Sequence, residues 1–389
     1  MIQLKELINK PISGEWGSDG EGIKVLRTTN FTNKGVINFK NVISRDISTK
    51  IIEQKRLLKG DIIIEKSGGS PTQPVGRVVY FDEDGDYVCN NFTSILRPKS
   101  EKVFPKYLHY LLFSNHKFGV TKMFQNKTTG IINLQLTRYL EKSKIPLPPI
   151  ETQKYFAQIL DDAAALRDKT EQLLKEYDAL AQSIFLDMFG DPILNPKLWK
   201  KDSLKKLGKT ITGNTPSREI DNFYGDFIEW IKTDNINTPN MYLTTAEEKL
   251  SELGLKKGRS VDVGAILVTC IAGSRRVIGN VAIADRKVSF NQQINAFIPN
   301  NTISLFWYYQ FILSQKYVQN NSTNGMKGII TKGKFEKMEF INPDIKYQNE
   351  FAEKITLIEK QKEFAKQELK ESEDLFNCLL QKAFKGELV

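Results

Sequence analysis

Three short motifs in this sequence could carry chemistry, but two lack a group that the reaction needs and the third stands in an unsuitable setting. Residues 328–335, GIITKGKF, are spaced like a phosphate-binding loop, but Phe335 stands where magnesium binding needs a hydroxyl. Residues 342–345, NPDI, begin like the Asn-Pro-Pro-aromatic motif of adenine methyl transfer, but no aromatic residue follows to clamp a flipped base. Residues 343–344, PD, with 368–370, ELK, imitate a metal-nuclease signature, yet the second part lies on an expected helix where mixed charges are ordinary surface. We therefore expect no catalytic centre in this chain.

Metal and cofactor sites are also not expected. The three cysteines, Cys89, Cys270 and Cys378, lie far apart without a Cys-x-x-Cys pair, and only His109 and His116 could supply imidazole. There is no Gly-x-Gly-x-x-Gly fingerprint for a dinucleotide. No run of about 18 apolar residues predicts a membrane span, and the first residues lack the apolar core of a signal peptide. We expect a cytoplasmic protein whose cysteines are not a disulfide framework.

The net charge of +10 is concentrated in two separate parts of the chain. Residues 1–150 hold 23 Lys and Arg against 14 Asp and Glu, and residues 191–345 hold 21 against 15. The segments after them are acidic, with 4 against 8 in 151–190 and 8 against 9 in 346–389. Two basic bodies are suited to a phosphate backbone, because lysine and arginine release its counterions. A basic protein that is merely soluble gives the same composition.

The two acidic segments are expected to be long helices. The first follows the proline run at 146–149, has Thr152 as a possible N-cap, continues without Pro or Gly to Phe189, and stops at Gly190. Spacings of four and three residues define a coiled-coil seam of about 38 residues, or roughly 57 Å at about 1.5 Å per residue. Its positions are Phe156, Leu160, Ala163, Arg167, Thr170, Leu174, Tyr177, Ala181, Ile184 and Met188. The same seam recurs 195 positions later as Phe351, Ile355, Ile358, Lys362, Ala365, Leu369, Ser372, Phe376, Leu379 and Ala383.

The regions before the helices repeat each other in the same way. Each has a buried strand entered through a glycine, at 60–64 and 264–268, then a polar loop, at 65–74 and 272–276. A helix follows at 105–113 and again at 304–314, then a last loop at 125–130 and 325–330. Matched lead-ins, Pro148 with Gln153 and Pro343 with Gln348, precede the long helices. We therefore divide the chain into a module at 1–150, a helix at 151–190, a module at 191–345 and a helix at 346–389.

This organisation resembles the specificity subunit of type I restriction-modification systems. The run IPLPPIETQ at 145–153 looks like the junction of that family, and the similarity covers essentially the whole chain. The second junction keeps one proline, Pro343, where the first has three. The resemblance implies an α+β fold with two target-recognition domains related by pseudo-two-fold symmetry and separated by two antiparallel coiled-coil helices. Each domain then reads one half of a split, asymmetric DNA target, and the helix length sets the gap.

Recognition requires polar groups on loops that can reach base edges in the major groove. In the first module these are Thr28, Asn30, Lys66, Ser67, Ser70, Thr72, Gln73, Arg77 and Lys127. In the second they are Thr233, Asn235, Ser274, Arg275, Arg276, Asn324 and Lys327. For any single residue, a solvated loop position explains the residue type as well as base contact does. Arg275-Arg276 is the best pair, because an arginine fork can hold guanine at two atoms.

The resemblance also implies partners. These are double-stranded DNA, two methyltransferase subunits that hold S-adenosylmethionine, and two restriction subunits that use ATP and Mg²⁺, with no cofactor in this chain. Outer helix residues are candidates for the subunit contacts, unless they only widen a buried helix face: Leu166, Leu173, Leu180, Phe185, Leu357 and Phe364. Two alternatives remain open, a nucleic-acid-binding scaffold without sequence preference and a stand-alone DNA-modifying enzyme.

Overall fold

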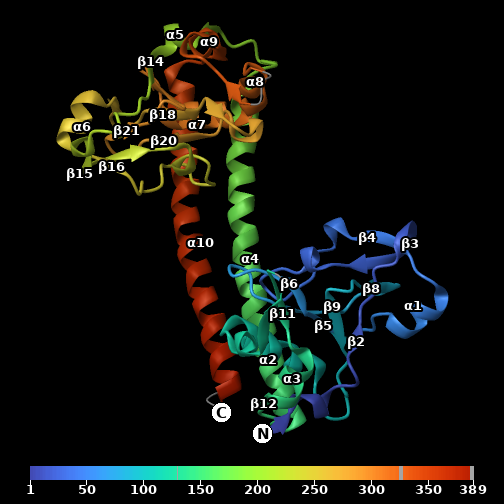
Figure 1. The fold of residues 1–389 in the computed structure, drawn as a ribbon. Helices are drawn as coiled ribbons and strands as arrows, with labels where there is room; N and C mark the ends of the chain where they lie inside the picture. Colours follow the sequence, from blue (N-terminus) through green and yellow to red (C-terminus); the bar gives the residue numbers. More distant parts are fainter. Residues whose placement is uncertain (129, 324–326, 386–389) are drawn as a thin grey trace. The chain divides into compact units, whose positions relative to one another are not determined.

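The chain folds into two compact units that share two long helices. The structure is a computed structural model, and it describes residues 1–128, 130–323 and 327–385. Unit 1 consists of Met1–Glu171 and Gln367–Val389, and unit 2 of Gln172–Lys366. The helices α4 (Ile150–Phe189) and α10 (Ile345–Lys385) therefore each contribute one segment to each unit (Figure 1). The four-part division by sequence stays a prediction, since the compact units divide the chain within the helices.

Unit 1 is built on a four-stranded sheet with the order β2-β9-β5-β7. Its central strand, β5, carries Ile62, Ile63 and Ile64, which are all fully buried because layers pack on both faces of the sheet. A three-stranded sheet, β4-β3-β8, and a second one, β10-β11-β6, flank it, and β1 pairs with β12. The strands of unit 1 are β1 (Ile2–Gln3), β2 (Ile12–Ser13), β3 (Ser18–Leu26), β4 (Ile43–Asp46), β5 (Ile62–Glu65), β6 (Ser67–Gly69), β7 (Val78–Tyr80), β8 (Tyr87–Cys89), β9 (Thr93–Leu96), β10 (Gln125–Thr128), β11 (Ile131–Leu134) and β12 (Lys144–Ile145).

Three shorter helices complete unit 1, α1 (Thr49–Lys55), α2 (Pro105–Lys117) and α3 (Leu136–Lys142). Helix α2 begins at a proline, which is favourable at the first helical position because its missing N–H needs no partner there. Its side chains Tyr107, Leu108 and Leu111 belong to one hydrophobic core with Phe156 and Leu160 of α4. The globular part of unit 1 is therefore joined to its helix segments by a continuous core.

Unit 2 repeats this plan with its own strands. A four-stranded sheet has the order β14-β22-β18-β20, a second has the order β16-β15-β21-β17, and β19 pairs with β23 and β13 with β24. The strands are β13 (Lys201–Ser203), β14 (Gly208–Thr212), β15 (Tyr224–Ile231), β16 (Lys249–Leu250), β17 (Ser260–Val261), β18 (Ile266–Thr269), β19 (Ile271–Ala272), β20 (Val281–Ile283), β21 (Val288–Phe290), β22 (Ile294–Pro299), β23 (Gly328–Ile329) and β24 (Glu339–Ile341). The helices are α5 (Leu204–Leu207), α6 (Glu252–Lys257), α7 (Ser304–Leu313), α8 (Gln315–Asn320) and α9 (Lys332–Lys337).

The two units share their central four-stranded sheet and the pairing of several other strands, while β10 of unit 1 and β17 of unit 2 have no counterpart among the described residues. In each, one strand of the second sheet pairs in parallel with a later one, β3 with β8 in unit 1 and β15 with β21 in unit 2. A 3-10 turn comes shortly after β3, at Thr28–Asn30, and shortly after β15, at Thr233–Asn235. The duplication predicted from sequence is therefore confirmed at the level of topology. The predicted fold class, mixed α and β with long paired helices, is also confirmed.

The predicted seam is buried within each unit. In unit 1, Phe156, Leu160 and Ala163 of α4 share a core with Phe376 and Ala383 of α10. In unit 2, Ala181 of α4 shares a core with α10 residues Phe351, Ile355 and Ile358. Within each unit, the early residues of one helix therefore meet the late residues of the other, which is antiparallel packing. Helix α4 begins at Ile150, two residues before the predicted N-cap Thr152, and ends before Gly190, whose φ of 76° suits a glycine.

The seam carries one buried base in each unit. Arg167 is 6% exposed, pairs with Asp168 at 2.8 Å, and lies 5.1 Å from the ring centroid of Phe376. Lys362 is 9% exposed and pairs with Asp178 at 2.7 Å and with Glu359 at 2.8 Å. Lys362 and Asp178 also line a cavity of about 280 Å³ in unit 2. Each buried charge is therefore compensated by a carboxylate on the helices themselves.

The matched glutamines at the start of the long helices make the same contacts in both units. Gln153 is 1% exposed, accepts from the backbone N–H of Phe104 at 2.9 Å, and donates to the Pro148 carbonyl at 2.8 Å. Gln348, also 1% exposed, accepts from the backbone N–H of Ile303 at 3.3 Å and donates to the Pro343 carbonyl at 2.9 Å. Phe104 and Ile303 are the N-cap residues of α2 and α7. Each glutamine therefore ties a long helix to the module helix beside it.

Candidate nucleic-acid interface

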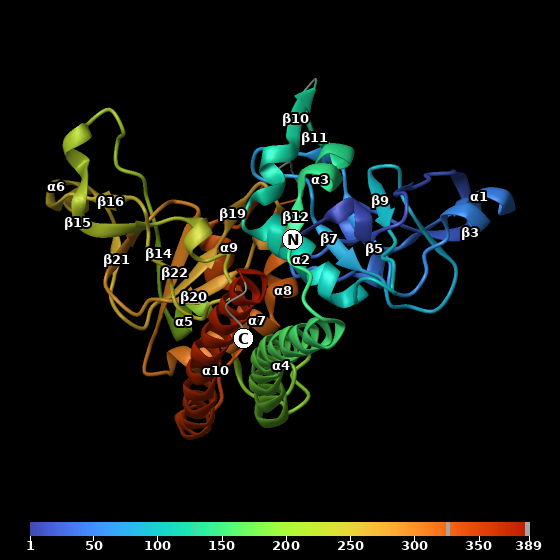
Figure 2. The ribbon, with the colours of Figure 1, turned by 90° about the horizontal axis from the view of Figure 1, so that it is seen from below.

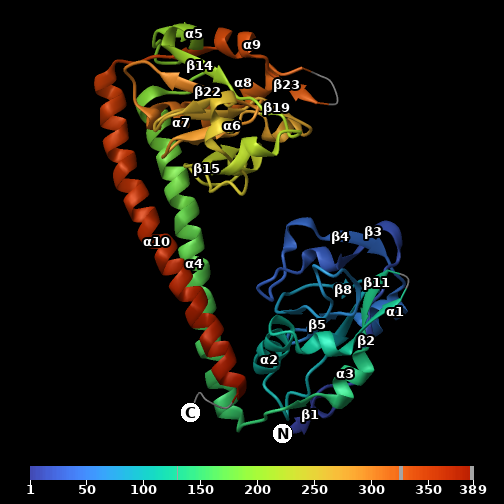
Figure 3. The same cartoon turned by 60° about the vertical axis from the view of Figure 1, so that its left-hand side comes forward.

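Each unit presents an equivalent edge where the predicted polar loop meets a late strand. In unit 1, β6 pairs with β11, which forms a hairpin with β10 (Figure 2). In unit 2, β19 pairs antiparallel with β23 (Figure 3). These edges bring together loops that are about 60 residues apart in sequence. The loop at 65–74 and residues 125–128, predicted separately, thus belong to one sheet in unit 1. The counterpart in unit 2 is the loop before Arg275 together with β23.

In unit 1 the polar loop is partly fixed by its own hydrogen bonds. The Lys66 ammonium contacts the Ser13 hydroxyl, and burial lowers the pKa of this lysine. The Ser67 hydroxyl donates to Asn133 Oδ1 at 2.5 Å. Ser70 closes a turn by accepting from the backbone N–H of Gln73 at 3.1 Å, and its hydroxyl lies 3.1 Å from that of Thr72. The Thr72 and Gln73 side chains remain exposed and can meet a ligand.

Arg77 does not project from this surface. Its guanidinium is buried, donates to both Glu65 carboxylate oxygens at 2.9 Å, and also donates to the carbonyls of Phe31 at 3.3 Å and Thr28 at 3.2 Å. The side chain therefore holds the turn at residues 28–31 against β5. This geometry gives Arg77 a supporting role in place of the direct base contact considered from sequence.

The turn at residues 28–30 is also closed by Asn30. Its side chain is 2% exposed, accepts from the backbone N–H of Arg27 at 2.9 Å and donates to the Asn38 carbonyl at 2.9 Å. Thr28 is half-buried in the same turn. Asn30 therefore shapes the backbone, while the neighbouring Thr29 is the exposed residue of the turn. Sequence analysis missed this division because both roles favour small polar residues.

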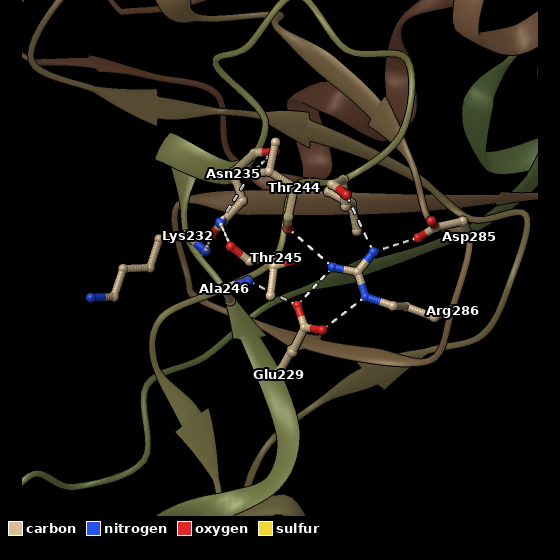
Figure 4. A network of polar contacts seen from close by, with 9 residues as sticks. Glu229, Lys232, Asn235, Thr244, Thr245, Ala246, Asp285 and Arg286 are labelled. Atoms are coloured by element: carbon tan, nitrogen blue, oxygen red, sulfur yellow. Dashed lines mark hydrogen bonds and ion pairs between the residues drawn. The ribbon is translucent and has the colours of Figure 1, made fainter. Parts of the chain in front are cut away.

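In unit 2 the ion pair of Arg286 with Glu229 holds the segment that the equivalent turn contacts through Asn235 (Figure 4). Asn235 accepts from the backbone N–H of Lys232 at 3.0 Å and donates to Thr244 Oγ1 at 3.3 Å and the Thr245 carbonyl at 3.1 Å. Arg286 donates to the Glu229 carboxylate at 2.9 and 2.7 Å and to the Leu243 and Thr244 carbonyls. The hydrogen bonds from Arg286 hold the pKa of Glu229 below its usual range. Thr233 is half-buried in this turn, as Thr28 is in the turn of unit 1.

Arg275 and Arg276 lie in a 3-10 turn, Arg275–Val277, directly after β19, and both side chains are exposed. Arg275 donates to the Gln319 carbonyl at 3.2 Å and to Asn320 Oδ1 at 3.4 Å, at the end of α8. Ser274 and Lys327 are exposed beside the paired strands. Asn324 lies outside the described residues, and so does the side chain of Lys127 at the hairpin of unit 1.

Several residues that position these loops were not found from sequence. Gln315 and Gln319 donate to the carbonyls of Arg276 and Ile278, each at 3.3 Å. Asn133 accepts a hydrogen bond from the Ser67 hydroxyl, and Arg286 donates to the carbonyl of Thr244, whose hydroxyl accepts from Asn235 in the turn of unit 2. The spacing of four between Gln315 and Gln319 is the one sequence signal, since it places both on one helix face. The remaining contacts join residues that are distant in sequence.

The described part of the chain offers little for metal or membrane chemistry. Among residues 1–128, 130–323 and 327–385, no group of three His, Cys, Asp or Glu side chains is placed to hold a metal ion. Over the same residues, no helix combines the length and apolar character that crossing a bilayer requires. Burial raises the pKa of Cys89 to about 11 and that of Cys270 to about 12. These two thiols are packing residues of the cores.

The duplicated scaffold with unlike polar edges is that of a DNA specificity protein. The family model of the type I restriction modification DNA specificity domain matches residues 3–176 and again 196–373. The chain belongs to this family. The expectation of a recognition component instead of an enzyme is confirmed by this assignment.

Two relatives are specificity subunits of type I restriction enzymes, and two solved structures share the fold. The specificity subunit of the type I restriction enzyme HindI from Haemophilus influenzae is 23% identical, over 86% of this chain and 88% of its own length. The putative MjaX specificity subunit from Methanocaldococcus jannaschii is 22% identical over 92% and 85%. A chain from a structure of type I R-M system assembly matches with a TM-score of 0.57 at 16% identity, over 100% and 97%. The S subunit from M. genitalium matches with a TM-score of 0.53 at 16% identity, over 98% and 95%.

Proposed function

We propose that this chain reads a two-part, asymmetric DNA target, with one half-site for each unit. The observation that carries the proposal is the equivalent edge of the two units, β6 with β11 and β19 with β23, which stands on a repeated scaffold but bears different side chains. A repeated scaffold fits two half-sites of similar shape, and unlike side chains fit two different base sequences. The positive charge of both modules favours a phosphate backbone.

Competition binding at fixed salt tests this function. The full chain is offered a labelled duplex carrying its selected two-part sequence, against random duplex of equal length. A sequence reader should favour the selected duplex by about 4–10 kcal/mol, as specific DNA-binding proteins do. Equal competition by both duplexes would support a scaffold without sequence preference. Methyl transfer or cleavage by the purified chain alone would support a stand-alone enzyme.

The chain would exert its effect through partner subunits. We infer an assembly with two methyltransferase subunits and two restriction subunits, which would hold S-adenosylmethionine, ATP and Mg²⁺. Exposed apolar side chains on the long helices are available for such contacts, with Leu357 64% exposed and Phe364 70% exposed. Leu166 and Leu180 are also exposed, whereas Phe185 is fully buried in the core of unit 2 and is not available.

The long helices would set the gap between the half-sites. Because α4 and α10 pass through both units, their length limits how far apart the half-sites can be. Adding four residues to each helix, about one turn, is expected to change the spacer that the protein prefers. The measurement is selection from duplexes in which the two half-sites are separated by varied spacers. An unchanged spacer preference would remove the helices from this role.

A further inference from the structure

We propose that Arg276 reads a guanine in the half-site of unit 2, and that Arg275, Gln315 and Gln319 are positioning residues that aim it. The proposal rests on the proposed function and names the base and the side chain that recognises it. A guanidinium presents two parallel N–H groups that match O6 and N7 of guanine in the major groove. No other side chain makes that bidentate contact as well, since lysine offers a single point charge.

Arg276 and Arg275 differ in the contacts of their side chains. The guanidinium of Arg275 is docked on the end of α8, where it donates to the Gln319 carbonyl and to Asn320. That of Arg276 is exposed and makes no hydrogen bond or ion pair within the described part of the chain. The two arginines, which the sequence analysis treated together, therefore differ: Arg275 is docked and Arg276 is free. The free one has all its donors available for a ligand.

The backbone of Arg276 is held in place by α8. Nε2 of Gln315 and Nε2 of Gln319 both donate to the Arg276 carbonyl and to the Ile278 carbonyl, all at 3.3 Å. Gly279 lets the loop approach this helix, because a Cβ there would meet Gln315 and Val318 at 3.1 Å and its φ is +80°. A loop whose carbonyls are held by two glutamine amides loses less conformational entropy when its side chain binds.

The two glutamines that hold this loop are connected to the central sheet of unit 2. Gln315 also donates to Asn280 Oδ1 at 2.5 Å, and Asn280 donates to Asn237 Oδ1 at 2.9 Å. The Asn237 oxygen is also 3.4 Å from the hydroxyl of Thr269, on β18. Asn237 follows the turn at Thr233–Asn235, so both predicted loops of unit 2 are fixed by one polar network. The free guanidinium thus stands on a rigid support.

Within its described residues, unit 1 shows no equivalent arginine at this edge. Arg77, just after the loop at 65–74, has its guanidinium bound by Glu65 and two carbonyls. In the loop at 65–74 the exposed side chains are Pro71, Thr72 and Gln73, which carry no charge. Guanine recognition by a free arginine is therefore assigned to unit 2, and the two half-sites differ in chemistry as well as in sequence.

Selection of the full chain on randomised duplexes, followed by sequencing of the bound pool, tests the assignment. Arg276→Lys keeps the charge and removes the fork, and Arg276→Ala removes both. Arg275→Ala releases the docked side chain, with Arg275→Lys as the conservative variant. Lys316→Ala, an exposed lysine on α8, is the control for a general loss of phosphate attraction. Thermal unfolding of every variant verifies that it is folded.

The wild type should select guanine at one position of one half-site, and Arg276→Lys should lower that preference roughly 5- to 150-fold at that position alone. Arg275→Ala should weaken the same position, with partial rescue by Arg275→Lys. Lys316→Ala should weaken all sequences equally. Unchanged preferences in Arg276→Lys, or a loss in Arg276→Ala that is spread equally over all positions, would overturn the assignment while sequence reading by the wild type stands. A wild type that selects no sequence would overturn the proposed function as well.

Discussion

Replacement of Arg77 by methionine should destabilise unit 1 and leave the choice of DNA sequence intact. The Arg77 and Glu65 side chains are 10% and 5% exposed, and two N–H groups of the guanidinium bind the carboxylate at 2.9 Å. Arg77→Met leaves that carboxylate buried without its partner. Breaking a buried pair in this way costs about 3–5 kcal/mol of unfolding free energy. The Thr28 and Phe31 carbonyls lose a donor as well.

The double variant Glu65→Leu with Arg77→Met distinguishes the cost of the unpaired carboxylate from the cost of lost packing. Removing both charges also removes the unpaired carboxylate, so the double variant should regain at least half of the lost stability. Arg56→Ala is the matched control, because the Arg56–Asp86 pair is exposed and its loss should change little.

Hydrogen exchange measured peptide by peptide localises the effect. Protection should fall in β5, in β7 and in the turn at 28–31 for Arg77→Met, and recover in the double variant. The selected DNA sequence should stay the same in both. An Arg77→Met protein of unchanged stability that has lost the preference for one base would refute the supporting role and restore a direct one.

Three further outcomes are expected. Gln153→Leu and Gln348→Leu each leave a buried helix-cap N–H without an acceptor, so each should lose about 1–3 kcal/mol, seen as a lower urea midpoint of the unit that carries it. Burial lowers the pKa of His109 from 6.5 to about 4, so between these pH values the unfolded state binds a proton that the folded state does not. The free energy of unfolding should therefore fall as the pH drops from about 6.5 to about 4. His109→Gln should make this pH dependence weaker in urea titrations. Native protein treated with iodoacetamide near neutral pH should be modified at Cys378, the exposed thiol, before the other two cysteines, and equal rates at all three would contradict the burial assigned to them.

The scaffold could be predicted because its signals are local and occur twice. The seam spacing, the prolines and the glutamines Gln153 and Gln348 recur at one constant shift, and the structure gives them the same contacts. Glycine before β5 and before β18 marked the entry to the central strands, because the φ values of Gly60 and Gly264, 93° and 88°, are ones that other residues rarely adopt. A glycine of this conformation before the equivalent central strand of both units is hard to obtain by chance.

The interface could be predicted only as groups of loops. Arg77 and Arg276 are both arginines beside a recognition loop, yet one is buried against Glu65 and the other is free. That difference depends on pairing between β5 and β7 and on docking of the second loop against α8, which residue types do not encode. Asn30 and Asn235 were predicted as readers because they are polar residues on loops, but asparagine also closes turns, and here both side chains bind their own turn.

The division of α10 between the units bears on how the chain is made. Phe376, Leu380 and Ala383 complete the core that Tyr107 and Leu111 begin, so the portion translated earliest cannot close its interior until the final turns of α10 leave the ribosome. Residues 172–366 form an uninterrupted stretch and can become compact before that moment. The N-terminal part of unit 1 is thus synthesised first and completed last, and during that delay the apolar surface of its incomplete core stays exposed.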